Sequence, residues 1–244
     1  MFGVQGRTIA SVTLRATMGR KRALLFAIPP LILIVVTLLI KASHPNDPSW
    51  PGQVLGIFGF SVVLPLTALI IGTSVLGAEV DDGSIVQLLA TPVPRSVVIA
   101  SKYVVAVALT MVFVAVPELL AGLIATGGAT KLAIGVFVGA LAGSAMYNAV
   151  FVMISVLTTR AIAFGLVYLL VWEGLLGNLV SGARLLSVGQ YSLGIANAIA
   201  HDATALNAGL SAGTAIVMGA IVTAIALVIG TRGLASFSLK GDAV

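Results

Sequence analysis

The chain has 244 residues, of which 59% are hydrophobic and 9% are charged, and it contains no cysteine. A soluble domain carries about 25% charged residues, so the composition excludes an ordinary soluble protein, and the lack of cysteine excludes disulfides and thiolate metal sites. Continuous apolar runs of about 20 residues predict an all-α membrane protein. The net charge of +5 is then explained by basic residues in the loops of such a protein, and it does not indicate a nucleic-acid partner.

The first 22 residues hold five basic residues and no acid. Ile9, Val12 and Ala16 fall on one side of a weakly amphipathic pattern, and the basic residues fall on the other. This pattern predicts a helix on the cytoplasmic surface of the membrane, in contact with membrane lipids. An unstructured basic tail is the alternative.

Six transmembrane helices are predicted in a single membrane domain, because six apolar segments are long enough to cross a bilayer. Pro29 and Pro30 are expected to break or bend the first helix, and Pro65 is expected to kink the second. Residues 181–210 contain only short apolar stretches and are expected on the outer side of the membrane. The predicted spans are residues 23–40, 54–76, 103–126, 132–158, 162–180 and 212–230.

The distribution of Lys and Arg predicts the orientation of these spans. With the N-terminus inside, ten basic residues fall in inner segments and three in outer segments, which is a strong positive-inside signal. Both termini are therefore expected in the cytoplasm of a cell whose plasma (bacterial inner) membrane holds the protein. The inner residues are Arg7, Arg15, Arg20, Lys21, Arg22, Arg95, Lys102, Arg160, Arg232 and Lys240, and the outer ones are Lys41, Lys131 and Arg184.

A polar loop, residues 77–102, separates the second and third predicted spans and is expected in the cytoplasm. Ser84 precedes Gln87 by three residues, which is the spacing of a capping box at the start of a helix. The apolar residues that follow share one face, and Pro92 ends the pattern. A helix of about two turns is marginal alone in water, so we interpret it as a docking element.

The polar loop has the pattern E-x3-G-S-x3-L-L-x2-P-x2-R-x6-K, from Glu79 to Lys102. It resembles the cytoplasmic loop of the six-helix permeases of ABC exporters, also called type V exporters or the type-two ABC membrane family. Asp82 and Ser84 depart mildly from that family, which more often has Glu and Thr there. From composition alone, the loop could equally cap its own bundle.

The resemblance implies that this loop forms a coupling helix, which enters a groove on a separate ABC ATPase subunit. It further implies that ATP and Mg²⁺ bind to that subunit, and that residues 181–210 form short outer helices that dip back into the membrane. The residues that carry the coupling are then Glu79, Asp81, Gly83, Ser84, Ile85, Gln87, Leu88, Leu89, Pro92 and Arg95.

Residues 186–190 (LSVGQ) read like the LSGGQ signature of an ABC ATPase. We reject this interpretation because the chain has no phosphate loop of the form G-x4-G-K-[ST]. The segment also falls on the predicted outer side. No catalytic residues are identified, and the chain itself is not expected to be an enzyme.

Two acids lie inside predicted spans, where a charge costs at least a few kcal/mol. Glu173 is expected near the midplane and Glu118 nearer the outer leaflet. Either could line a path for an ion or a cargo, or relay protons, together with Asn148. Alternatively, each acid could be hydrogen-bonded or protonated and tie helices or the dimer together, through Asn148 or Asn178. We expect no metal site, since the two histidines, His44 and His201, are isolated in predicted loops.

Small residues recur at spacings of four in the fourth predicted span, at Gly135, Gly139 and Gly143. This spacing allows close packing of helices, and we expect contacts within the bundle or a dimer rather than a pore lining. An aromatic series could coat a cavity, but packing in the core or against lipid is the better interpretation. The series comprises Tyr147, Phe151, Tyr168 and Trp172.

The sequence thus favours the transmembrane subunit of an ATP-driven ABC exporter. It would form a homodimer or pair with a sister permease, bind two copies of the ATPase, and export an amphipathic or apolar drug, antibiotic, peptide or lipid. Two alternatives stay open: a secondary transporter driven by an ion gradient through Glu173 and Glu118, and a membrane module for immunity or assembly that transports nothing.

Overall fold

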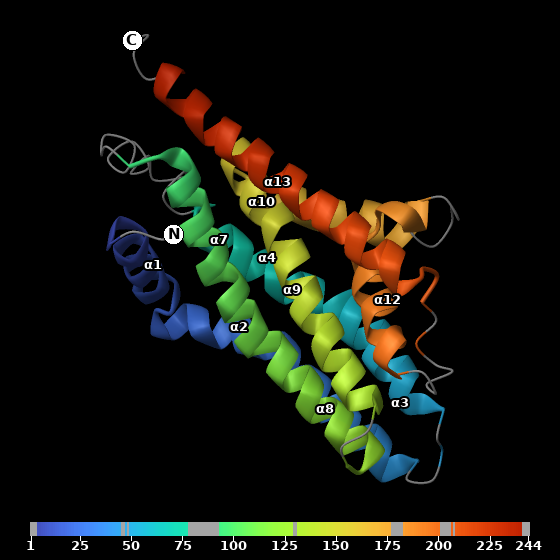
Figure 1. The fold of residues 1–244 in the computed structure, drawn as a ribbon. Helices are drawn as coiled ribbons and strands as arrows, with labels where there is room; N and C mark the ends of the chain where they lie inside the picture. The colour runs from blue at the N-terminus through green and yellow to red at the C-terminus, as the bar shows by residue number, and fades with distance from the viewer. Residues whose placement is uncertain are drawn as a thin grey trace.

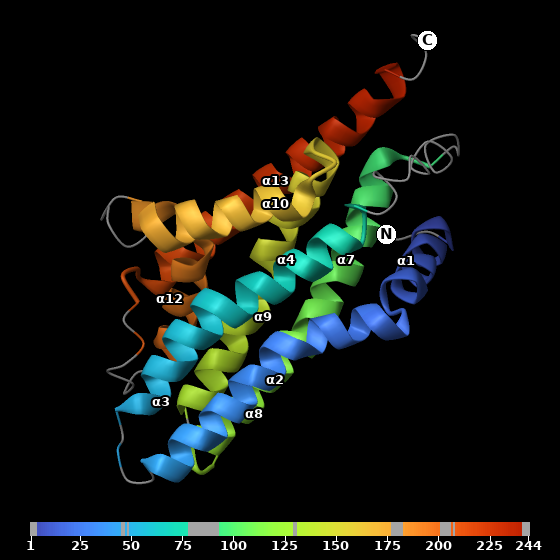
Figure 2. The same cartoon turned by 180° about the vertical axis from the view of Figure 1, so that it is seen from behind.

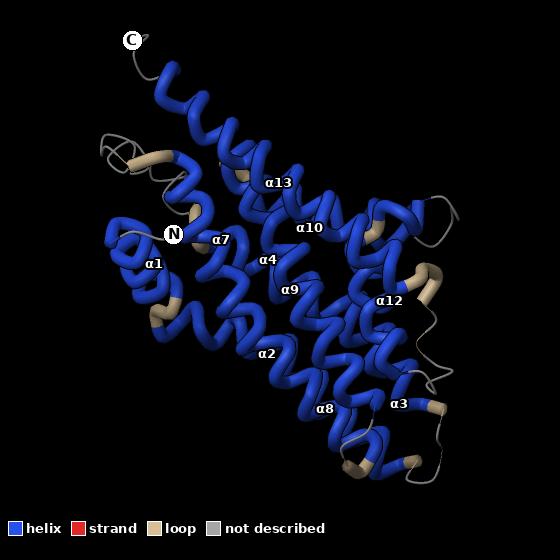
Figure 3. The backbone as a smooth tube through the Cα atoms, viewed as in Figure 1, coloured by secondary structure: helices blue, strands red, loops and turns tan. Residues whose placement is uncertain are grey.

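The computed structural model describes residues 4–44, 47, 49–77, 93–128, 131–176, 183–200, 206 and 208–240, and every regular element in these ranges is helical. The helices lie side by side in one bundle (Figure 1), and short connections join many of them (Figure 3). In chain order the elements are α1 (Val4–Thr17), α2 (Arg20–Ser43), α3 (Trp50–Gln53), η1 (Val54–Val63), α4 (Leu64–Ser74), α7 (Arg95–Thr110), η2 (Met111–Ala115), α8 (Val116–Thr126), α9 (Lys131–Leu157), α10 (Ala161–Val167), η3 (Tyr168–Leu176), η4 (Ala183–Leu186), α12 (Val188–Ala200) and α13 (Ala212–Lys240).

Within the described part of the chain, five helices are long and apolar enough to cross a membrane, and each overlaps one predicted span. The fifth predicted span, residues 162–180, begins as a shorter apolar helix, Ala161–Gly174. The count of six therefore stays a prediction. The five long helices are Ala23–Ser43, Trp50–Ser74, Arg95–Thr126, Lys131–Leu157 and Ala212–Ala235.

The helix of the third span begins at Arg95, eight residues before the predicted start of that span, so the last eight residues of the predicted loop 77–102 are helical. Pro94 caps α7, and its carbonyl accepts the N–H groups of Val97 and Val98 at 2.9 and 3.3 Å. The polar residues between Arg95 and Lys102 pointed to a loop. They are nevertheless helical, because Val98 and Ile99 among them are buried in the core.

Two of the spans change to π-helical geometry just before a proline. In η1, the N–H of Leu64 bonds to the carbonyl of Gly59, one residue before Pro65. In η2, the N–H of Val116 bonds to the carbonyl of Met111, one residue before Pro117. A proline has no N–H and its ring crowds the preceding turn, and the widened turn relieves this crowding. The predicted disturbance at Pro65 thus takes the form of a π-helix.

Helix α2 contains Pro29 and Pro30 and continues through both without a break. Its first turns run at an angle to the rest of the helix (Figure 2). The structure therefore has the bend that the two prolines predict, and not the break.

Helix α1 is separate from α2 and packs against α7. Its buried residues are Gly6, Thr13 and Thr17, whereas Val12 is 60% exposed and Ala16 is exposed too. Of the predicted apolar side, Ile9 packs on the core, whereas Val12 and Ala16 are exposed, so the contact of this side with lipid stays a prediction.

The segment between residues 181 and 210 contributes helix α12, which packs along α9. A Cβ at Gly139 would lie 2.7 Å from both the Ala196 Cβ and the Ser192 carbonyl oxygen, and one at Gly143 would lie 2.5 Å from the Ser192 Oγ. The glycines at spacings of four are therefore contacts within the bundle, as predicted.

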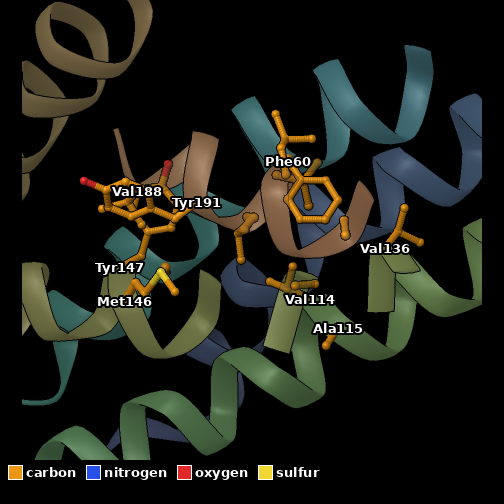
Figure 4. Close-up of a cluster of buried hydrophobic side chains, with 14 of the residues drawn as sticks. Phe60, Val114, Ala115, Val136, Met146, Tyr147, Val188 and Tyr191 are labelled. Atoms are coloured by element: carbon orange, nitrogen blue, oxygen red, sulfur yellow. The ribbon is translucent and has the colours of Figure 1, made fainter. Parts of the chain in front are cut away.

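The buried side chains form two clusters. One lies among η1, η2, α9 and α12, and part of it is drawn in Figure 4 around Phe60, Val114 and Tyr191. The other joins α2, α4, α7, α9 and α13 around Phe26, Ile71 and Val98. In Figure 1, α1, the start of α7 and the last turns of α13 lie at one end of the molecule, and the turn between α8 and α9 lies at the other.

Candidate functional site

The two spans that flank the polar loop are fastened to each other where the loop leaves them. The Nζ of Lys102, on α7, donates a hydrogen bond of 2.8 Å to the carbonyl oxygen of Val75, the C-cap residue of α4. Lys102 is 1% exposed, so its charge is buried at the negative end of a helix, where a cation is stabilised. The sequence predicted that Lys102 belongs to the loop motif, but not this contact.

Arg95 is the first residue of α7 and the one coupling residue of the prediction that the structure describes. Its Nη1 is buried and has no hydrogen-bond partner. A buried guanidinium nitrogen that lacks an acceptor is costly, so Arg95 carries an unsatisfied donor at the end of the polar loop. Nine other predicted coupling residues lie outside the described residues: Glu79, Asp81, Gly83, Ser84, Ile85, Gln87, Leu88, Leu89 and Pro92.

Glu173 binds the N-terminus of α12. Its Oε1 accepts the N–H of Val188 at 2.9 Å and the hydroxyl of Tyr168 at 3.1 Å. Its Oε2 accepts the hydroxyl of Ser187 at 2.5 Å and the N–H of Gly189 at 3.4 Å. The first N–H groups of a helix have no partner within it and favour a negative charge. Glu173 therefore caps α12 and joins it to η3.

The π-helical geometry of η3 presents the side chains that make this junction. A π-helix bonds residue i to residue i+5, and the two residues that meet here, Tyr168 and Glu173, are five apart. The indole N–H of Trp172 adds a bond of 3.1 Å to the carbonyl of Leu186. The junction thus joins η3 to the LSVGQ segment through main-chain and side-chain bonds.

The sequence identified Glu173 as a candidate and named Asn148 and Asn178 as alternative partners, and Asn148 is not its partner in the structure. The amide nitrogen of Asn148 bonds instead to Thr110 Oγ1 at 2.8 Å and to the Ser144 carbonyl at 2.7 Å, and Asn178 lies outside the described residues. A signal was available in Ser187, because a serine directly before an apolar helical segment is typical of an N-terminal cap.

A cavity of about 250 Å³ lies beside this junction, between α4, α10, η3 and α12. Its walls are mostly apolar, with polar groups from Glu173, Ser187, Gln190 and Tyr147. The aromatic side chains pack in the core, since the rings of Tyr147 and Phe151 stack at 5.9 Å and Phe151 meets Tyr168 edge-on at 6.2 Å. Tyr147 also lines the cavity.

A second, more open cavity of about 600 Å³ lies between α2, α4 and α10, and Arg160 lies in its wall. Gly77, at the start of the polar loop, lines the same cavity. Leu166 contributes to the walls of both cavities. The two cavities therefore follow the same pair of helices, α4 and α10, from the polar-loop end toward Glu173.

Glu118, on α8, lies in different surroundings. It is 0% exposed, and neither of its carboxyl oxygens has a hydrogen-bond partner. The carboxyl packs against Gly59 of η1 so closely that a Cβ there would collide with it. The three predicted path residues thus serve different contacts: Glu173 caps α12, Asn148 bonds α9 to α7, and Glu118 packs on η1.

Comparison with known proteins adds one match. A family model described as "ABC-2 family transporter protein" matches residues 19–181, about two thirds of the chain. The matched range includes the whole polar loop, Lys102, Glu118 and Glu173. None of the curated proteins matches the chain.

Proposed function

The chain belongs to the ABC-2 family of transporter proteins, and from this premise we propose that it is the export channel of an ATP-driven transporter. Membership makes it a membrane subunit of an ABC transporter that works with an ABC ATPase subunit. We propose further that two ATPase copies bind its cytoplasmic side, carry the ATP and Mg²⁺, and drive the spans through a coupling helix in the polar loop.

The contact between Lys102 and Val75 is the observation that carries this proposal. A force applied to the loop reaches the second and third spans together, because the hydrogen bond fastens their ends to each other. The buried cluster around Ile71 and Val98 joins the same ends to α2, α9 and α13. Close-packed interiors transmit displacement because they compress little.

Arg95 supports the same proposal from the loop side. Its Nη1 is buried without an acceptor, although a guanidinium group forms strong paired bonds with carboxylates. We propose that an acidic residue of the ATPase supplies the acceptor when the subunits meet.

The cavities along α4 and α10 support an amphipathic or apolar cargo, such as a drug, an antibiotic, a peptide or a lipid. Their walls are mostly apolar, and polar groups are confined to a few positions that include Arg160 and Glu173. The neighbouring face of α10 and η3 exposes Phe164, Val167 and Leu170. We propose that a second permease, identical or a sister chain, covers this face and completes the path.

The proposal is tested by placing a photo-crosslinking amino acid at Leu88 and co-expressing the chain with its candidate ATPase. The matched control carries the same group at Leu185, an exposed leucine on the predicted outer side. We expect the ATPase to be trapped from position 88 and not from position 185. No adduct at 88, or equal adducts at both positions, would contradict a coupling helix in the loop.

Two further outcomes separate the alternatives. Cargo uptake by the isolated chain in liposomes, driven by an ion gradient without ATP, would favour a secondary transporter. A resistance phenotype that persists when Leu88 and Leu89 are both replaced by aspartate would favour a module that protects the cell by binding alone.

A further inference from the structure

Glu118 is a fully buried acid whose two carboxyl oxygens both lack a hydrogen-bond partner. An isolated carboxylate in an apolar interior is so costly that such a group takes up a proton or pairs with a cation. Glu173 differs, because four donors surround its oxygens. Glu118 therefore requires a bound proton or cation, whereas the oxygens of Glu173 are already satisfied by donors of the protein.

The surroundings of Glu118 offer an acceptor for a proton. Phe60 is next to Gly59, against which the carboxyl packs. The Phe60 carbonyl would bond to the N–H of residue 64 in an α-helix and to that of residue 65 in a π-helix. The N–H of Leu64 goes to Gly59 instead, and residue 65 is a proline, which has no N–H. The residue after Gly59 thus has a main-chain carbonyl without a helical donor.

We propose that Glu118 is a proton-binding site, held as a neutral carboxylic acid whose O–H is donated to a main-chain carbonyl of η1. A protonated carboxyl is a donor as well as an acceptor, so one proton satisfies both the acid and the carbonyl. A metal cation is the weaker ligand for this place, because the described residues bring no group of three His, Cys, Asp or Glu together.

The site has a mechanical consequence for the bundle. Glu118 and Lys102 both belong to the third span, Arg95–Thr126. Glu118 packs on Gly59 within the second span, Trp50–Ser74, and Lys102 bonds to Val75, the residue that caps it. Lys102 joins the two spans next to the polar loop, and Glu118 joins them toward the opposite end. With the proton bound, the two spans are held at two points and move as one body. The inference concerns the chain alone and holds whether or not an ATPase binds.

The test is infrared spectroscopy of the purified chain in a detergent without ester groups at neutral pH, in the region of the carbonyl stretch of protonated carboxylic acids. We expect a band in the wild type that is lost in Glu118→Gln and kept in Glu173→Gln. Identical bands in the wild type and in Glu118→Gln would overturn the inference. Loss of the wild-type band when sodium replaces a bulky organic cation would overturn it too, since the ligand would then be a metal ion.

A second variant covers the case in which Glu118→Gln does not fold. Gly59→Ala adds a methyl group where the carboxyl packs, while all eight acids of the chain are kept. We expect the band of Glu118 to shift in frequency, because the hydrogen bond to η1 is displaced. The matched control is Gly213→Ala, where nothing lies within 4 Å of the added Cβ, and it should leave the band unmoved. An unshifted band in Gly59→Ala would contradict the site.

Discussion

The ammonium of Lys102 lies 2.8 Å from the carbonyl oxygen of Val75, so the third span holds the last turn of the second. Both residues are buried. The loop that joins the two spans therefore starts and ends on a single packed unit. This relationship underlies the proposal that movement of the loop is passed to the membrane helices.

Replacing Lys102 by methionine should weaken this unit. The change keeps a long apolar side chain but leaves the Val75 carbonyl without this donor, and an unsatisfied buried polar group costs about 1–3 kcal/mol. We expect a lower midpoint of thermal unfolding in detergent and reduced stimulation of ATP hydrolysis. Arg160→Met, which removes an exposed charge, is the control and should change the midpoint little. Equal midpoints for the wild type and Lys102→Met would contradict the contact.

Replacing Glu173 by glutamine should release the N-terminus of α12. The amide retains one oxygen, while its NH₂ group would face donors such as Ser187 and Gly189. Hydrogen bonds to a charged group contribute about 1.5–3 kcal/mol each. Amide hydrogen exchange in Val188–Tyr191 should therefore be faster. Trp172→Phe, which removes a single bond to Leu186, should have a smaller effect, and unchanged exchange in Glu173→Gln would refute the capping role.

A methyl group at Gly139 should separate α9 from α12. The added Cβ would lie 2.7 Å from Ala196 Cβ and from the Ser192 carbonyl, and overpacking of this kind costs about 1–3 kcal/mol. Gly213→Ala is the matched control, because the added Cβ meets open space. In a helix, alanine is more favourable than glycine by about 1 kcal/mol. We expect thermal unfolding midpoints to fall for the first and to hold or rise for the second. A lower midpoint for Gly213→Ala than for Gly139→Ala would contradict the close approach of α9 and α12.

Arg95→Gln should weaken binding of the ATPase and leave the fold intact. The guanidinium Nη1 has no acceptor within the chain, so its removal breaks no hydrogen bond of that nitrogen in the free subunit. We expect a loss of affinity of about tenfold or more, as for a charge-assisted pair at an interface. The measurement is titration of the ATPase onto nanodiscs that carry the wild type or the variant. Equal affinities would exclude a role for Arg95 in docking.

Apolar run length was enough to predict the long helices, since crossing a bilayer requires about 20 apolar residues. The start of α7 was missed because Arg95, Ser96, Ser101 and Lys102 look like loop residues in isolation. They are helical because Val98 and Ile99 among them are buried in the core, and the carbonyl end of α4 accepts the Lys102 charge, a contact between residues 27 apart. Similarly, Glu173 stood out as an intramembrane acid, but three of its four donors come from residues 14 to 16 positions later. Spacing within one helix cannot reveal such partners.

The central claim is that the ATPase drives this permease through the polar loop. It is tested most directly by ATP hydrolysis in nanodiscs that contain the permease and its ATPase, with Leu88→Asp/Leu89→Asp beside the wild type. The account predicts that the wild type binds the ATPase and stimulates its hydrolysis, and that the double variant, although folded, does neither. Binding and stimulation that are the same in both proteins would contradict it.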